Sequence, residues 1–465
     1  VLFEQEFGAS QPMLPLKDSG HIVYGNSLRI DWNEVCPNNG SDEIYIIGNP
    51  PFKGRKNRTE DQTRDMEVTF KEFKNFKNLD YVTSWFWKGA QYIADSDAKL
   101  ALVSTSSVVQ GIQVSILFPD IFELGISIDF AYQSFPWKNS AKDNAAVHVV
   151  IIGLSPKTNK NKKIFKLIGT NWHTENTDSI NPYLMTGNPI AVISRTYPFT
   201  DISQVVDGSN YTKSEPLIMD TEQKNEILNK EPDLEKWIRP LLGSKEFLHG
   251  IQRWCFWLVD ALEDDISNSK ILSDLVEQVK IDRQNSKKKD TREKAVLIPH
   301  LFPEIRQPTD GSYLLIPKVS SERRFYIPIG FFDSNVIATN KVSIIPNGSL
   351  YDFGLITSKM HNEWMRLVAG RLESRYNYSG TIVYNTFPFP DATDEQKQHI
   401  ESLAEEILLA RASNAGMTLA ELYDPDKMPE DLKQAHSNLD DAVDKLYRMQ
   451  GFSNTEERLA LLRAR

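Results

Sequence analysis

The sequence predicts an α/β fold in its first third, a mixed α+β region after it, and a helical tail at the C-terminus. In residues 1–156, short apolar runs that suit buried strands alternate with segments of helical period. Residues 157–390 mix short strands, turns and isolated helices, whereas residues 391–465 place apolar side chains at helical spacing. We therefore expect three domains with these boundaries.

The composition is that of an ordinary globular protein of 465 residues. The longest apolar stretch, Ala145–Leu154, is far too short to cross a bilayer, and no signal-peptide pattern opens the chain. Two cysteines, Cys36 and Cys255, are too few and too far apart for a zinc site or a disulfide framework. We expect a cytoplasmic protein with no membrane partner and no metal site.

The net charge of −10 is concentrated in the tail, where residues 391–465 carry sixteen acidic residues against nine Lys and Arg. The rest of the chain is nearly balanced, and basic clusters occur at residues 53–58, 157–163 and 287–289. Such clusters are compatible with phosphate contacts, although most clusters of this kind are solvated loops. The acidic balance therefore does not exclude a nucleic-acid partner.

One short loop, Gly48–Phe52, combines a predicted position at the end of a buried strand with unusual chemistry. Two consecutive prolines fix two φ angles and remove two N–H donors, so acceptor groups are held outward. The Asn49 side-chain oxygen and the Pro50 carbonyl can then accept both protons of a planar amino group, while Phe52 offers a face on which a ring can stack. The sequence predicts a clamp for a conjugated amine.

The tetrapeptide from Asn49 to Phe52 resembles motif IV of the S-adenosylmethionine-dependent amino-methyltransferases. Its Asn-Pro-Pro-Phe form is usual in enzymes that methylate adenine N6 in DNA. The resemblance implies that Asn49, Pro50 and Phe52 are catalytic, that Phe52 stacks on a flipped adenine, and that the cofactor is S-adenosylmethionine. A bare tetrapeptide of this kind can also be a tight turn after a strand, so the surrounding sequence has to decide.

Residues 22–32 precede this loop and suggest a short apolar strand followed by a turn. The segment resembles motif III of the same methyltransferases, and the resemblance places Asn26 at the adenine edge of the cofactor. The alternative is an asparagine with a purely structural role in a strand-end turn.

After the loop, the periodicity predicts alternating helices and strands, namely helices at 79–95 and 113–124 and strands at 100–103, 128–131 and 146–152. This order resembles the second half of a Rossmann-like S-adenosylmethionine-dependent methyltransferase sheet, whose last two strands form a hairpin. The hairpin carries Phe135, which resembles the motif VIII aromatic that stacks on the flipped base. Trp137 is the alternative stacking residue, and a core aromatic is the alternative role.

The first 47 residues begin with Val1 and contain only isolated glycines. A methyltransferase of this kind needs a Gly-rich loop after its first strand and an acid that binds the cofactor ribose. Neither is visible, so we expect an incomplete cofactor site. The N-terminal half of the methyltransferase would then be missing from this chain. Whether a nuclease domain lies upstream stays open. The isolated chain is then expected to be inactive.

Residues 317–328 alternate basic and hydroxylated side chains on what reads as a strand. Lys318, Arg323 and Arg324 are our candidates for contacts with the DNA backbone, although an ordinary solvated strand is equally compatible with the pattern.

Several segments together resemble the single-chain restriction-modification enzymes of type IIG, subgroup IIL; they comprise residues 141–153, 320–324, 360–366, 370–379 and 384–390. The resemblance implies an adenine-N6 methyltransferase domain, a mixed α+β target-recognition domain that binds double-stranded DNA, and a helical C-terminal tail. Two further functions stay open. One is a DNA-binding specificity module without activity, and the other is a protein glutamine N-methyltransferase, which would leave most of the chain without a role.

Glu373 and Arg375 lie two residues apart on a segment that we predict to be extended, so both side chains would point to the same side. A carboxylate accepts from cytosine N4 and a guanidinium donates to guanine O6 and N7, so the pair suits a C·G base pair. In the resembling family, such a pair goes with cytosine 3′ to the methylated adenine. The alternative is a surface salt bridge that holds a loop.

Overall fold

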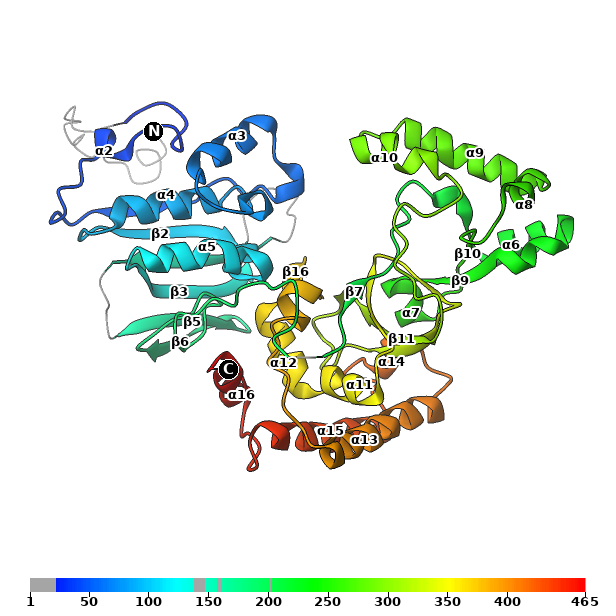
Figure 1. Ribbon diagram of the computed structural model, residues 1–465. Helices are drawn as coiled ribbons and strands as arrows, with labels where there is room; N and C mark the ends of the chain where they lie inside the picture. The colour runs from blue at the N-terminus through cyan, green and yellow to red at the C-terminus, as the bar shows by residue number, and fades with distance from the viewer. Residues whose placement is uncertain (1–21, 138–146, 157–160, 201, 465) are drawn as a thin grey trace, which may run out of the picture. The chain divides into compact units, whose positions relative to one another are not determined.

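The computed structural model describes residues 22–137, 147–156, 161–200 and 202–464. The chain forms two compact units, the first comprising residues 1–108 and 116–189 and the second comprising residues 109–115 and 190–465 (Figure 1). Residues 1–21, which begin the N-terminal segment with isolated glycines, lie outside the described residues. Part of the basic cluster at 157–163 also lies outside them. The mixed α/β architecture with several sheets and a helical tail confirms the predicted fold class.

The first unit is built on a six-stranded sheet of order β1-β2-β4-β3-β5-β6. Its strands are β1 (Tyr45–Gly48), β2 (Lys99–Thr105), β3 (Ser127–Pro136), β4 (His148–Ser155), β5 (Lys162–Ile168) and β6 (Asn171–Thr177). Strands β1 and β2 are parallel, β4 is antiparallel to both β2 and β3, and β3 and β4 form the predicted hairpin. Strands β5 and β6 extend the same sheet past residue 156.

The helices of the first unit are α2 (Trp32–Val35), α3 (Glu60–Thr69), α4 (Thr83–Ile93) and α5 (Gly111–Glu123). Helix α4 packs on β2 so closely that a Cβ at Gly89 would lie 2.6 Å from Leu100 Cδ2, and that side chain would have to shift. The predicted helix at 79–95 thus exists but begins at Thr83, because Thr83 Oγ1 and its amide both bond to the Asp80 carbonyl and close a turn there.

Two predicted strand features are wrong. Residues 22–24 form no strand, and Ile22 and Tyr24 are exposed. Strand β1 exists but is not buried, because within the described chain it pairs only with β2 and is therefore an edge strand. Tyr45 is 59% exposed and Ile47 is 80% exposed on it. The apolar run indicates a strand correctly, but its burial depends on a neighbour that the run does not reveal.

The second unit contains three small sheets, of order β14-β9-β10-β8, β13-β11-β15-β7 and β12-β17-β16. Their strands are β7 (Val206–Asp207), β8 (Ile218–Met219), β9 (Ile238–Leu242), β10 (Trp254–Phe256), β11 (Ser312–Pro317), β12 (Val319–Ser320), β13 (Gly330–Asp333), β14 (Ile337–Ala338), β15 (Val342–Pro346), β16 (Gly370–Leu372) and β17 (Arg375–Asn377). Its core includes one apolar cluster around Phe256 and another around Tyr313.

The helices that accompany these sheets are α6 (Thr221–Lys230), α7 (Ser244–His249), α8 (Glu263–Ser267), α9 (Lys270–Gln284), α10 (Lys289–Glu293), α11 (Leu350–Thr357) and α12 (Lys359–Val368). Helix α9 is anchored by Arg283, which is fully buried and donates to three backbone carbonyls that follow it, those of Ala295, Ile298 and Leu301. Helix α12 leads directly into β16.

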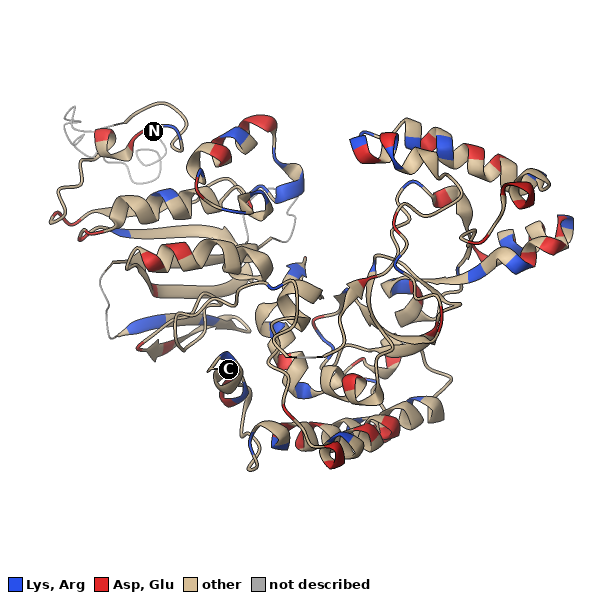
Figure 2. Cartoon of the chain, in the orientation of Figure 1, with Lys and Arg blue, Asp and Glu red and all other residues tan. Residues whose placement is uncertain are grey.

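The tail consists of α13 (Asp394–Ser413), α14 (Leu419–Leu422), α15 (Glu430–Tyr447) and α16 (Thr455–Ala464). Figure 2 shows acidic residues along α13 and α15, while the predicted apolar faces are buried, including Ile400 and Leu439. Asn454 Oδ1 accepts from the Glu457 amide at the start of α16. Within the described residues, no helix is long and apolar enough to span a membrane.

Candidate functional site

The loop after β1 is hydrogen-bonded to the segment that precedes α4. Asn49 is exposed, Pro50 is buried, and Phe52 is half-buried. The Lys53 carbonyl accepts from the Tyr81 amide at 2.9 Å. These contacts fix the loop just beyond its proline pair, so the Asn49 side chain and the ring of Phe52 are presented on a rigid support.

The register of the sheet brings Phe135 to the same edge as this loop. Gly48 lies level with Leu102 of β2, and Phe135 lies level with Thr105, which is three residues farther along β2. Since β1 and β2 are parallel, both the loop and Phe135 lie at the carboxyl end of β1. They are three strands apart, or roughly 14 Å at the usual strand spacing.

Phe135 lies on the rim of the sheet and not in its core. It is half-buried, and its ring packs edge to face against Trp172 of β6 with 5.2 Å between ring centroids. Trp137, the alternative stacking residue, is also half-buried and extends the hairpin by donating its amide to the Val147 carbonyl at 2.8 Å. Both aromatics are therefore accessible at this edge.

Asn26 lies in a turn whose polar atoms are already engaged within the protein. Its Oδ1 accepts from the Leu28 amide at 3.0 Å, and its Nδ2 donates to Asp65 Oδ2 at 2.9 Å. Asp65 is buried and also accepts from Arg29 and from the Tyr81 hydroxyl. Burial alone would raise the pKa of Asp65, but the hydrogen bonds that it accepts outweigh burial and lower it.

The sequence analysis did not identify Asp65 or Tyr81 as parts of the site. The only available signal is local: Asp65 is adjacent to the buried Met66 in α3, a position at which a charged residue needs partners. Nothing in the spacing of the sequence indicates that these partners are Asn26 and Arg29, which lie more than thirty residues upstream.

In the second unit, Glu373 and Arg375 lie at the tip of a hairpin. Leu372 of β16 pairs with Arg375 of β17, so Glu373 and Ser374 form a two-residue turn and the predicted extended segment is wrong. Glu373 has a φ of +60°, which non-glycine residues rarely adopt. Its carboxylate nevertheless meets the Arg375 guanidinium at 2.7 Å, with both side chains exposed, as in the salt-bridge alternative.

The predicted backbone contacts are not on one strand, because β12 ends at Ser320 and turns follow it. Lys318 lines a cavity of about 530 Å³ and pairs with Asp207 at 2.6 Å, so it would have to leave that partner to reach a phosphate. Arg323 is exposed and bonds to Asp426. Arg324 is half-buried, with its Nη1 directed to Ser320.

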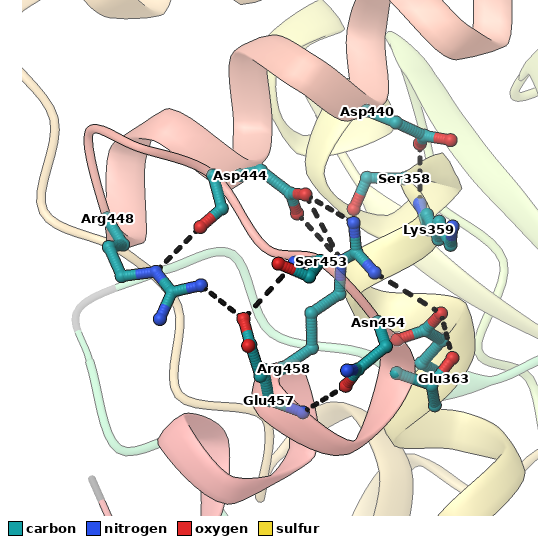
Figure 3. Close-up of polar contacts among 12 residues, drawn as sticks. Ser358, Lys359, Glu363, Asp440, Asp444, Arg448, Ser453, Asn454, Glu457 and Arg458 are labelled. Carbon is teal, nitrogen blue, oxygen red and sulfur yellow. Dashed lines mark hydrogen bonds and ion pairs between the residues drawn. The ribbon is translucent and has the colours of Figure 1, made fainter.

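A buried ion-pair cluster fixes the helix that carries the hairpin (Figure 3). Arg458 of α16 donates to Asp444 of α15 through Nη2 at 2.6 Å, and its Nη1 lies 3.8 Å from Glu363 of α12. All three side chains are at most 7% exposed. Because α12 is followed by β16, this cluster anchors the base of the Glu373–Arg375 hairpin to the tail.

A second buried carboxylate, Asp440, lies beside this cluster. It accepts from the Tyr326 hydroxyl at 2.6 Å and from the Lys359 amide, at the start of α12, at 2.7 Å. Burial raises the pKa of Asp440 to about 7. Asp424 and Asp426 of the tail likewise pair with Arg323. The described residues contain no group of ligands that could hold a metal ion.

Comparison with known proteins explains this arrangement. Family models match consecutive stretches of the chain: the MmeI DNA-methyltransferase domain matches residues 1–166, the MmeI target recognition domain 186–391, and the MmeI C-terminal domain 392–465. The chain carries MmeI-like methyltransferase, target-recognition and C-terminal domains. The expectation of a missing half and of an inactive chain finds no support in these matches.

DNA methyltransferase A of Bacillus subtilis (strain 168) is 41% identical over 454 residues, which are 98% of this chain and 51% of that protein. The structure of the type IIL restriction-modification enzyme MmeI in complex with DNA is 39% identical, with a TM-score of 0.92, and covers 100% of this chain and 62% of that one. The chain thus spans about half the length of the curated relative.

Replacing Arg458 with alanine should destabilise the protein by about 3–5 kcal/mol, because two buried carboxylates would lose their cationic partner. Urea denaturation of the purified chain measures this loss. Lys445→Ala, an exposed change on α15, is the matched control and should stay within about 0.5 kcal/mol of the wild type. Equal effects of the two variants would show that the cluster contributes nothing specific.

Asp440 should make the protein less stable as the pH rises from about 4 to about 7. Its folded pKa lies above the unfolded value, so in this window the folded state binds more protons and loses stability as they leave. The stability of the wild type relative to Asp440→Asn, which cannot titrate, should therefore fall between pH 5 and pH 8. A constant difference in unfolding free energy across this range would contradict the assignment.

Proposed function

We propose that this chain methylates adenine N6 at a specific sequence in double-stranded DNA, with S-adenosylmethionine as the methyl donor, as part of a restriction-modification enzyme. The observation that carries the proposal is the Asn49–Phe52 loop. It stands at the carboxyl end of a sheet strand, on the same edge as Phe135, within an MmeI-like methyltransferase domain. Ligands of open α/β sheets bind at such ends.

The clamp acts on the target amine. The Asn49 side-chain oxygen and the Pro50 carbonyl accept the two N6 protons, which favours localisation of the nitrogen lone pair. Bound S-adenosylmethionine would supply the methyl group that this lone pair attacks, and one N6 proton would then be lost to solvent. Phe52 and Phe135 hold the extruded ring from two sides. Each base–aromatic stack contributes about 1–3 kcal/mol.

The described residues fit one part of the cofactor. We place an N–H of the Asn26 amide, whose Nδ2 donates to Asp65, at the adenine edge of S-adenosylmethionine, which would supply an electrophilic methyl group when bound. The turn that carries Asn26 is held to α4 by Lys88, whose Nζ donates to the Leu28 carbonyl at 2.8 Å. The fixed turn therefore presents that N–H in one direction.

The proposal that the partner is DNA rests on the match of residues 186–391 to a target recognition domain, and on a related protein whose structure contains DNA. The hairpin tip supports it independently. Glu373 is exposed and strained, and an exposed salt bridge returns only about 0–1 kcal/mol. The two-residue hairpin turn requires this backbone conformation and places both charged side chains at an exposed tip, where a base edge could reach them. Arg323 and Lys318 are the proposed backbone contacts, with Arg324 beside them.

Asn49→Ala should abolish methyl transfer while DNA binding stays within a few-fold of the wild type, because only this side chain accepts from the amine. Phe52→Ala should be milder, since it removes one stack worth about 1–3 kcal/mol. Transfer of radiolabelled methyl groups to DNA and a gel-shift titration measure the two quantities. Substantial methylation by Asn49→Ala would sink the clamp assignment, whereas DNA binding without any methylation by the wild type would favour a specificity module.

The double variant Glu373→Lys with Arg375→Asp should change the target base 3′ to the methylated adenine from cytosine to guanine. The exchanged charges would suit a G·C pair in the opposite orientation, and loss of the original contact costs about 1–3 kcal/mol of discrimination. Methylome sequencing of cells that express each form reads this base directly. If the double variant keeps the original base, or if the wild-type target has no cytosine there, the pair is only structural.

A further inference from the structure

We propose that Asp80 and Tyr81 are positioning residues that join the turn of Asn26 to the loop of Asn49, so that cofactor and target base are held in a fixed relation. The inference rests on the proposed function and extends it to two residues that match none of the motifs noted in the sequence. They are adjacent in the chain, immediately before α4, and each bonds to both a neighbouring segment and the clamp loop.

Asp80 ties the clamp loop to the end of β2. Its Oδ1 accepts from the Arg55 amide at 3.0 Å, and its Oδ2 accepts from Ser107 Oγ at 2.7 Å. Ser107 follows β2 directly and also bonds to Thr105 Oγ1 at 2.8 Å, in the last residue of that strand. One carboxylate therefore links the loop after β1 to the segment after β2, at the edge where the clamp stands.

Tyr81 ties the same loop to the Asn26 turn. Its amide donates to the Lys53 carbonyl at 2.9 Å, and its hydroxyl donates to Asp65 Oδ2 at 2.7 Å. The same Asp65 oxygen accepts from Asn26 Nδ2 at 2.9 Å. Burial and the Asp65 carboxylate both raise the pKa of Tyr81, so the hydroxyl keeps its proton and remains a donor. Tyr81 and Asn26 therefore meet at one carboxylate oxygen.

The neighbouring residues make this connection rigid. The ring of Tyr81 packs edge to face on Trp85 with centroids 5.0 Å apart, and Trp85 Nε1 donates to Ser27 Oγ at 2.9 Å. The Asn26 turn is thus attached to α4 by a second route that does not pass through Asp65. Methyl transfer needs the amine and the methyl group in near-contact geometry, where a displacement of about 1 Å can cost about 100-fold in rate. A fixed link between their two binding segments supplies that geometry.

The first test uses amide hydrogen exchange of the whole chain, which needs neither cofactor nor DNA. Tyr81→Phe keeps the ring and removes only the hydroxyl that bonds to Asp65. We expect exchange to accelerate in residues 26–30 and also, about 10-fold, at the Arg55 amide, although the altered atom does not touch that loop. Tyr92→Phe is the matched control, because it removes a hydroxyl from α4, the helix that follows Tyr81, and the partner of that hydroxyl is the Cys36 carbonyl. It should leave both segments unchanged.

The second test measures single-turnover methyl transfer. Ser107→Ala should lower the rate about 10-fold with an unchanged Kd for DNA, whereas Ser107→Thr, which retains a hydroxyl, should restore it. Tyr81→Phe should lower the rate and also raise the KM for S-adenosylmethionine. Tyr92→Phe should change neither quantity.

The outcomes separate the inference from the proposed function. If Tyr81→Phe accelerates exchange only in residues 26–30, or if Tyr81→Phe and Ser107→Ala both keep the wild-type rate, the positioning role is refuted while Asn49→Ala still tests the clamp. If both segments respond to Tyr81→Phe but the wild type methylates no DNA, the link stands and the proposed function fails.

Discussion

A pair of prolines at the end of an edge strand is the constraint on which the candidate site depends. Pro50 and Pro51 cannot donate hydrogen bonds, so the loop cannot satisfy its own carbonyls by folding back. Its order has to come from elsewhere, and the structure supplies it through the residues just beyond the loop, where Lys53 and Arg55 bond to Tyr81 and Asp80. Asn49 is exposed on this supported loop.

In the second unit, an exposed turn is likewise supported by residues outside it. An exposed and strained turn at Glu373 needs a rigid base, and that base is α12, whose buried Glu363 meets Arg458 from the last helix. Removing a partner from such a cluster leaves a buried charge uncompensated, so the tail and the hairpin are energetically tied. The buried acids of the tail therefore have a structural role.

Local patterns in the sequence predicted much of the fold. Helix α4 and the tail helices follow from apolar spacing, and the β3–β4 hairpin follows from two apolar runs, because these signals lie within a single element. Features that depend on a distant neighbour were missed. Strand β1 is exposed because, among the described residues, it pairs with a neighbouring strand on one side only. The segment predicted to be extended at Glu373 is a tight turn that contains no glycine.

The candidate site shows the same difference between local signals, which the sequence reveals, and distant partners, which it does not. The clamp could be recognised from four adjacent residues, whereas Asp65 and Asp80 could not, since each matters through partners more than twenty residues away in the sequence. Lys318 illustrates the opposite case: its basic side chain suggested a phosphate contact, but the fold places Asp207 against it. A charge in a sequence does not reveal whether the folded chain already neutralises it.

The most direct test of the account is the pattern of methylated bases in the source genome, read at single-base resolution with and without this gene. The account predicts that one sequence motif, with N6-methyladenine followed by cytosine, is methylated only when the gene is present. Identical methylation in both strains, or gene-dependent methylation confined to cytosine, would contradict it.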